Sequence, residues 1–339
     1  LAWLQGEIKK HFKITDQGPL SSVLNVDVLR TPTGISLGQP GYINKILERF
    51  QMDSGKTAFT PLPTSGIAHP EDPSYCSETD KELFQQLVGS VNYLACYTRP
   101  DIAFAVHALS RHLANPTVHA LSAAKTLLRY LKTTKNYRLS FPKLTSGRKL
   151  TLRVYTDADF ANQKAAYHPK TRFSPQNQVL MPENREDREN TPRKSVTGMI
   201  FLLNGAPISW LSKQQPIIAT STQMAEYIAA AEGGKEALWL RSLLKSLQLW
   251  DNTGVPLHID NQAAIQLCKN PVLHKATKHI DIIYHKIREL AADGIITIEF
   301  TESSSQKADA LTKPLSRQRT EEFCRGIHMV GQKTPEDLE

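Results

Sequence analysis

Apolar residues at alternating or helical spacing divide the first half of the chain into distinct segments. Alternation over residues 21–38, broken by a turn at 31–34, predicts a hairpin, and a three-and-four spacing over 42–50 predicts a helix. Residues 53–80 carry four prolines and few apolar anchors, which favours a linker. The same spacing predicts further helices at 1–15 (the end of one), 84–94, 101–113 and 121–131.

The pattern changes at residue 149, where an alternating strand runs through Tyr155 into two aspartates. Residues 163–194 are polar and contain four prolines, so we expect a disordered insertion without a core. Beyond it the spacing predicts strands at 196–203, 207–211, 255–259 and 295–300, and helices at 222–248, 261–268, 278–292 and from about 306. Trp239 stands among leucines and is expected to pack in the core or at an interface, not to stack on bases. This order describes a mixed sheet flanked by helices, an α/β layer architecture.

The composition is that of a folded protein with a moderate basic excess. The chain has 339 residues, 40% hydrophobic and 22% charged, which favours two or three domains and argues against disorder throughout. Lys and Arg exceed Asp and Glu by eight, which favours a polyanionic partner, although many basic proteins bind none. The four cysteines lie far apart, which excludes a Cys-rich zinc module and a disulfide scaffold and fits a reducing compartment.

The sequence also bears on membranes and secretion. No stretch approaches the roughly 20 apolar residues that a membrane span needs, so we expect no membrane partner. The first residue is Leu1 and charged residues follow early, which argues against a signal peptide. We therefore expect a piece of a longer chain that is not secreted.

Four carboxylates stand where such a sheet could gather them. Asp157 and Asp260 end two apolar strands, Glu226 lies one turn into the long helix, and Asp309 follows the last strand. Any one of them alone is typical of a strand end, a helix surface or a helix cap. Together they suit hard divalent ions such as Mg²⁺, and two ions about 3.5–4 Å apart can activate a water and stabilise a leaving oxygen. Asp159 shares a strand face with Asp157 and is either its supporting partner or its replacement.

A basic segment at 269–288 is a candidate for nucleic-acid contact. It contains five Lys or Arg residues and three histidines against a single aspartate, and its candidate residues are Lys275, Lys278, His279 and His285. Such side chains contact phosphates and supply most non-specific affinity. The alternative is a solvated basic face. The histidines lack the cysteines or carboxylates that would complete a tetrahedral zinc site.

Ordered motifs along the whole chain resemble a known family. They are TRPDI (98–102), LRYLK (128–132), RKSVTG (193–198), SW and SKQ (209–214), STQMAEY (221–227), DNQ, KHID and YH (260–285), AD (308–309) and LTKPL (311–315). In this order they resemble the C-terminal part of the Pol polyprotein of copia-type LTR retrotransposons, from the late reverse transcriptase region through ribonuclease H. The resemblance covers roughly residues 1–330 and is interrupted by the insertion.

The resemblance implies a domain organisation. Residues 148–315 would form a ribonuclease H-like domain, a mixed sheet flanked by helices. It would be preceded by a smaller α+β remnant of the reverse transcriptase palm at 1–63 and by a helical, thumb- or connection-like region at 64–147. Residues 316–339 would form a C-terminal tail.

The resemblance also implies an activity and a site. Asp157, Glu226, Asp260 and Asp309 match the family's four metal-binding catalytic carboxylates, which implies two Mg²⁺ ions, with Mn²⁺ as a substitute. The implied enzyme is a ribonuclease H that cuts the RNA strand of an RNA–DNA hybrid, and only RNA offers a 2′-OH in the wide minor groove. Gln262 matches a position that could reach that groove, or it is an ordinary polar residue at a helix start. Lys213, in a matching motif, is expected to contact nucleic acid.

The same resemblance sets expectations for context. No Asp-Asp pair occurs in the chain, so we expect it to begin after the polymerase motif and to show no reverse transcriptase activity. The implied partners are an RNA–DNA hybrid and the rest of the Pol polyprotein, including the upstream polymerase and integrase, in a cytoplasmic particle or the nucleus. The oligomeric state stays open. The alternative hypothesis is a decayed or co-opted fragment that binds nucleic acid without cutting it, which an insertion beside a catalytic strand would favour.

Overall fold

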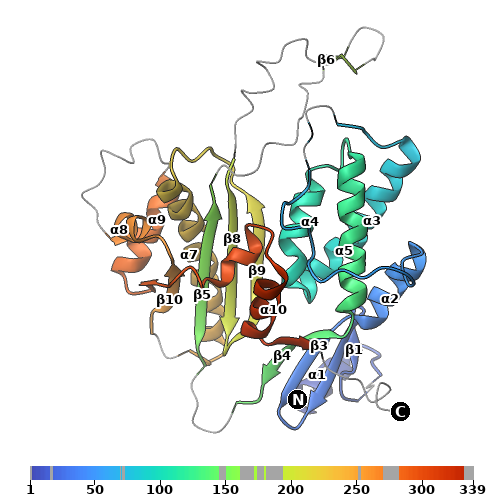
Figure 1. Cartoon of the computed structure of the whole chain (residues 1–339). Coiled ribbons are helices and arrows are strands. Elements are labelled where there is room, and N and C mark those ends of the chain that lie inside the picture. Colours follow the sequence, from blue (N-terminus) through green and yellow to red (C-terminus); the bar gives the residue numbers. More distant parts are fainter. Residues whose placement is uncertain are drawn as a thin grey trace.

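A computed structural model gives the fold of the chain (Figure 1). The structure describes residues 2–15, 18–68, 70, 73–144, 150–160, 172–173, 179–180, 194–250, 253–269 and 282–331. The expected insertion at 163–194 therefore lies outside the described residues, apart from residue 194 and the backbone of two short strands, β6 (Arg172–Phe173) and β7 (Val179–Leu180).

A five-stranded mixed sheet forms the centre of the C-terminal half. Its spatial order is β11-β10-β5-β8-β9. The strands are β5 (Leu152–Asp159), β8 (Val196–Leu203), β9 (Ala206–Gln214), β10 (Val255–Ile259) and β11 (Ile296–Phe300). β5, β8 and β9 pair antiparallel, whereas β10 runs parallel to both β5 and β11. The expected α/β architecture with a mixed sheet is confirmed.

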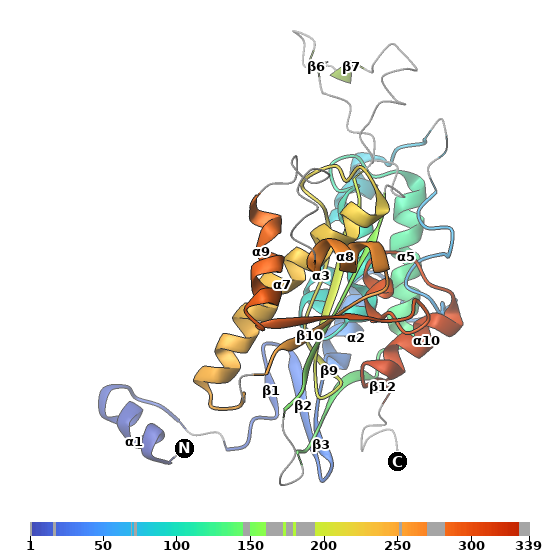
Figure 2. The same cartoon turned by 90° about the vertical axis from the view of Figure 1, so that its left-hand side faces the viewer.

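Helices cover one face of this sheet (Figure 2). They are α7 (Thr222–Ser246), α8 (Gln262–Lys269) and α9 (Ile282–Ala292). Ser221 caps α7 by accepting a hydrogen bond from the Met224 N–H, as serine commonly does at a helix start. Trp239 does not pack in the core, since it is 57% exposed, and its alternative role at an interface stays a prediction. Leu240 and Leu244 take the buried side of α7, and Trp239 falls outside that side.

The opposite face carries a 3₁₀ turn, η3 (Lys307–Leu311), and then α10 (Arg317–Gly326), where a single helix was expected from about residue 306. The close approach of η3 to β8 depends on Gly198. A Cβ at that position would lie 2.6 Å from the Thr312 Cγ2 and 2.8 Å from the Ala308 carbonyl oxygen. Any larger residue would therefore push η3, and with it Asp309, away from the sheet.

A second sheet is antiparallel throughout and has the order β1-β2-β3-β4-β12. Its strands are β1 (Ser22–Val23), β2 (Val26–Thr31), β3 (Gly34–Gly38), β4 (Tyr137–Pro142) and β12 (Met329–Gly331). The hairpin β2–β3 was expected, whereas β4 and β12 were not. Residues 317–331, assigned to a tail, thus form a helix and a strand, with Phe323, Cys324 and Ile327 buried.

The remaining N-terminal helices form a separate apolar core. They are α2 (Pro40–Arg49), α3 (Glu78–Tyr97), the 3₁₀ turn η1 (Pro100–Ile102), α4 (Ala103–Ser110) and α5 (Val118–Thr133), while α1 (Ala2–His11) precedes the hairpin. The linker at 53–80 is irregular only up to α3, and it contributes Leu62 and Ile67 to this core. Among the described residues, no helix has the length and apolarity to cross a membrane.

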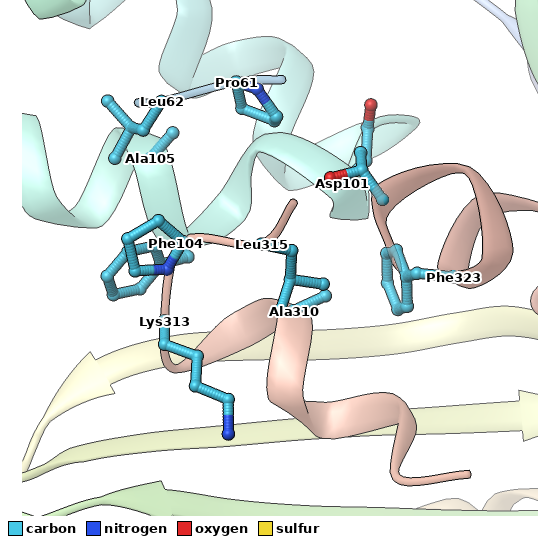
Figure 3. Close-up of a pocket in the computed structure, with 11 residues that line it drawn as sticks. Pro61, Leu62, Asp101, Phe104, Ala105, Ala310, Lys313, Leu315 and Phe323 are labelled. Atoms are coloured by element: carbon cyan, nitrogen blue, oxygen red, sulfur yellow. The ribbon is translucent and has the colours of Figure 1, made fainter. Parts of the chain in front are cut away.

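Side chains from both halves meet at a junction formed by Pro61, Phe104, Ala310, Leu315 and Phe323 (Figure 3). The cavity left there is only about 20 Å³, room for about one water molecule, so the junction is a packing interface and not a substrate pocket. The Trp210 Nε1–H donates a hydrogen bond of 2.6 Å to the Ala95 carbonyl, which ties β9 to α3. Because of these contacts, the helices and the mixed sheet form one packed unit.

Candidate metal centre

The sheet topology accounts for the meeting of two aspartates. Asp157 is near the end of β5, and Asp260 directly follows β10. The two strands are parallel neighbours, with Leu257 opposite Val154, so their carboxyl ends reach the same edge of the sheet. The strand-end pattern seen in the sequence therefore becomes a pair of adjacent carboxylates.

Asp309 completes a group of three. It projects from η3, and one carboxylate oxygen from each of Asp157, Asp260 and Asp309 lies within 4.8 Å of the others. Asp157 and Asp309 are buried, while Asp260 is half-buried. Asp159, the alternative to Asp157, does not belong to this group.

Glu226 reaches the same place from α7. Its side chain is buried, and its Oε1 accepts a hydrogen bond of 3.3 Å from the Ala158 N–H. Within the described part of the chain, its Oε2 has no hydrogen-bond donor. A buried carboxylate oxygen without a donor is costly, which is consistent with a position reserved for a cation.

Donors on neighbouring elements hold the three aspartates. The Thr312 hydroxyl donates to the Asp157 carboxylate, and the Ser303 hydroxyl donates to Asp260 Oδ2 at 2.8 Å. Asp309 pairs with Lys313 Nζ at 2.9 Å and with the Arg319 guanidinium at 3.0 Å. Arg319 also donates to the Ser303 carbonyl at 3.2 Å, so one side chain joins the supports of two aspartates.

Burial and mutual repulsion raise the pKa values of carboxylates in this cluster. Burial, followed by the charge of Asp309, raises the pKa of Asp157 to about 6, although Thr312 and Lys313 act in the opposite direction. Burial and the charges of Asp157 and Asp260 raise the pKa of Glu226 well above its ordinary value. Carboxylates this close resist full ionisation, and a divalent cation would relieve their repulsion.

The donor set fits a hard divalent metal ion. Carboxylate oxygens are the ligands that Mg²⁺ and Mn²⁺ prefer, and all four side chains offer only such oxygens. Asp157, Asp260 and Asp309 could bind an ion directly, with Glu226 beside them.

Divalent cations are expected to stabilise the folded protein. At an ion concentration about ten times Kd, the free energy of unfolding should rise by about 1.4 kcal/mol, because only the folded chain gathers the carboxylates. Thermal unfolding of the metal-stripped chain, with and without added Mg²⁺ or Mn²⁺, measures this gain. The variant Asp157→Asn should lose it, while Asp293→Asn, at an exposed position, should keep it. An equal gain in Asp157→Asn would place the ion elsewhere.

Only some of the residues expected to contact nucleic acid belong to the described part of the chain. Gln262 begins α8 and is exposed two residues beyond Asp260, and Lys213 is exposed on β9, the edge strand two places from β5. Lys275, Lys278 and His279 lie outside the described residues, and for His285 only its backbone in α9 is described. The structure thus brings the four carboxylates together and leaves these contacts as predictions.

Sequence reasoning missed the residues that support the cluster: Ser303, Thr312, Lys313 and Arg319. A signal existed for two of them, since Thr312 and Lys313 follow Asp309 by three and four residues in a motif already noted. Arg319 lies ten residues from its partner on another element, so no local spacing could have identified it.

Comparisons with known proteins point to transposon polyproteins. The chain is 37% identical over 337 residues to the Retrovirus-related Pol polyprotein from transposon TNT 1-94 of Nicotiana tabacum, covering 97% of this chain and 23% of that protein. It is 35% and 32% identical to the Retrovirus-related Pol polyproteins from transposons RE1 and RE2 of Arabidopsis thaliana, covering 94% and 95% of this chain and 20% of each relative. The chain thus spans about a fifth of the length of these curated relatives.

Comparisons with protein-family models and with solved structures add no further evidence on the family of this chain. No protein-family model matches the chain. Among solved structures, the Mos1 mariner paired end complex with Mn shares 11% identity and a TM-score of 0.21, covering 96% of this chain and 82% of that one. That likeness is too low to compare the folds.

Proposed function

The chain is homologous to the C-terminal portion of copia-type, retrovirus-related Pol polyproteins from transposons, and from this premise we propose that it is a ribonuclease H. In this proposal it hydrolyses the RNA strand of RNA–DNA hybrids and uses two Mg²⁺ ions, for which Mn²⁺ can substitute. Its place is within the larger polyprotein, alongside the polymerase and the integrase.

One observation carries the proposal: Asp157, Asp260 and Asp309 converge, with Glu226 beside them, at the edge of a mixed sheet flanked by helices. These four residues come from segments as distant in the chain as residues 157 and 309. Four independent surface carboxylates have no reason to meet, so the convergence supports a shared role in binding cations.

The four carboxylates would hold the ions, which supply an activated water and stabilise the leaving oxygen of the phosphodiester. The chain's own residues keep the oxygens in place. Thr312 and Ser303 orient Asp157 and Asp260 by hydrogen bonds. Lys313 and Arg319 fix Asp309 and offer positive charge beside a phosphate.

Recognition of the hybrid would rest on groups around this cluster. Gln262, exposed two residues beyond Asp260, would donate to or accept from a 2′-OH in the minor groove. Lys213 on β9 and the basic residues of segment 269–288 would contact phosphates and make the affinity strongly dependent on salt.

The proposal is tested by the products formed from three labelled substrates. With Mg²⁺, the purified chain should cut the RNA of an RNA–DNA hybrid and leave single-stranded RNA and duplex DNA nearly intact. Excess EDTA should stop the reaction, because it removes the ions that would activate the attacking water. Equal cutting of all three substrates, or cutting in EDTA, would contradict it. Tight binding of the hybrid without any cutting would instead support the alternative of a non-catalytic fragment.

A further inference from the structure

A second concave site lies away from the carboxylates, on the face of the mixed sheet that carries η3 and α10. It is an open cavity of about 830 Å³ between the two sheets. Its walls come from the end of β4 and the residues after it, the start of β5, the β8–β9 turn, the first residue of η3 and the segment between α10 and β12. A space of this size is comparable to known ligand pockets and is not a packing defect.

The walls of this cavity carry one sign of charge. Lys143, Arg153 and Lys307 line it together with His328, and none of the twelve described residues that line it is an aspartate or glutamate. Lys307 packs so closely against Gly326 that a Cβ there would lie 2.6 Å from its ammonium nitrogen. Like charges gathered in a concavity favour an anionic occupant.

The cavity wall is built by close packing. Gly205, in the β8–β9 turn, has a φ of +90°, and a Cβ there would lie 2.6 Å from the His328 ring. The imidazole of His328 therefore packs directly against the Gly205 backbone. The backbone of His328 has a φ of +55°, which is typical of a tight turn. The His328 side chain is thus held at the rim of the cavity by close packing and is not a freely moving surface side chain.

This basic cavity is connected to the metal centre through β5 and η3. Arg153, Tyr155 and Asp157 alternate along β5, so their side chains share one face, and Arg153 is about 13 Å from Asp157 at the usual rise per residue. Lys307 stands two residues before Asp309 in η3. Between the two sites Tyr155 stacks on His258 at 4.6 Å, and the nearby carboxylate of Glu299 is 3.7 Å from the His258 ring.

We propose that this cavity binds phosphodiester groups of a nucleic-acid strand whose neighbouring nucleotides lie at the carboxylate cluster. This inference rests on the proposed function, which places the strand at the carboxylates. It adds a second contact to the strand, away from the bond that is cut. A separation of about 13 Å corresponds to roughly four nucleotides along a duplex axis. The cavity is too large for one phosphate ion, and its cations come from several elements, which suits a strand that passes through.

The test measures hybrid affinity as a function of salt. The variant Arg153→Gln/Lys143→Gln removes two exposed cations of the cavity without touching η3 or the carboxylates, and Lys245→Gln/Lys135→Gln removes two exposed cations elsewhere as a matched control. All proteins carry Asp260→Asn so that the hybrid stays intact. Fluorescence anisotropy with a labelled RNA–DNA hybrid should show a slope of log K against log salt that is smaller by about 1.8, or 0.9 per lost contact, in the cavity variant alone.

The outcomes separate this inference from the proposed function. If both double variants change the slope equally, the cavity is not a phosphate site and the inference is overturned, whether or not the native chain cuts hybrids. If the slope falls only in the cavity variant while the native chain fails to cut, the inference stands and the nuclease proposal fails. A thermal shift of the protein by inorganic phosphate, abolished in the cavity variant without any loss of hybrid affinity, would assign the cavity to small anions and overturn the strand proposal.

Discussion

Replacing Asp260 by Asn is expected to abolish hybrid cutting while leaving the fold intact. The substitution removes one negative charge from a cluster whose three aspartate oxygens lie within 4.8 Å of one another, and so weakens the hold on the cations. Asp260 is half-buried and its Oδ2 accepts from Ser303, a bond that an amide oxygen can still accept. The rate should fall at least about a thousandfold, equivalent to roughly 4 kcal/mol of lost transition-state stabilisation.

The rate is followed by gel analysis of end-labelled RNA in the hybrid, with circular dichroism and thermal unfolding to confirm the fold. Asp293→Asn, at an exposed position beyond α9, makes the same chemical change outside the cluster and should cut at the native rate. Asp159→Asn also addresses the alternative raised by the sequence, and a greater loss there than in Asp157→Asn would reverse the assignment. Native activity in Asp260→Asn would rule out the two-metal proposal.

Replacing Asp101 by Ala is expected to give the largest loss of stability, about 3–5 kcal/mol in the free energy of unfolding. Arg99 is 1% exposed and donates two hydrogen bonds to Asp101, at 2.9 Å and 2.7 Å. The Tyr130 hydroxyl donates to the same carboxylate at 2.7 Å. Without Asp101, the guanidinium would remain buried with only the oxygens of Thr134 to accept from it. An uncompensated buried charge is much costlier than the loss of an exposed ion pair.

Urea unfolding of the two proteins gives the difference. Glu321→Ala, which removes the exposed pair with Arg317, is the matched control and should cost less than about 1 kcal/mol. A similarly small change in Asp101→Ala would show that water or a local rearrangement compensates Arg99. Asp101 lies where η1 packs against α10. The hybrid-cutting activity of the folded variant therefore also tests whether the bonds among Arg99, Asp101 and Tyr130 help to position the sheet that carries Asp157.

Much of the secondary structure could be predicted from local periodicity. Alternation identified β5, β8 and β10, and a three-and-four spacing identified α3, α5 and α7, because burial on one face repeats every two residues in a strand and every 3.6 in a helix. The same reasoning missed β4 and β12. β12 has only three residues, and both strands are stabilised by partners distant in the sequence: β4 pairs with β3, and β12 pairs with β4 across nearly 200 residues of chain.

For the candidate site, the places of Asp157, Glu226, Asp260 and Asp309 at the ends or first turns of predicted elements were enough to select them, and the motif resemblance then gave the set a role. Only the tertiary structure decided that their oxygens converge, that Asp159 stays outside the group and that Arg319 supports Asp309. It also decided that Trp239 is exposed and that Lys307 faces a basic cavity. The physical reason is that residue type and spacing report local burial, whereas desolvation, charge pairing and cavities depend on segments brought together only by folding.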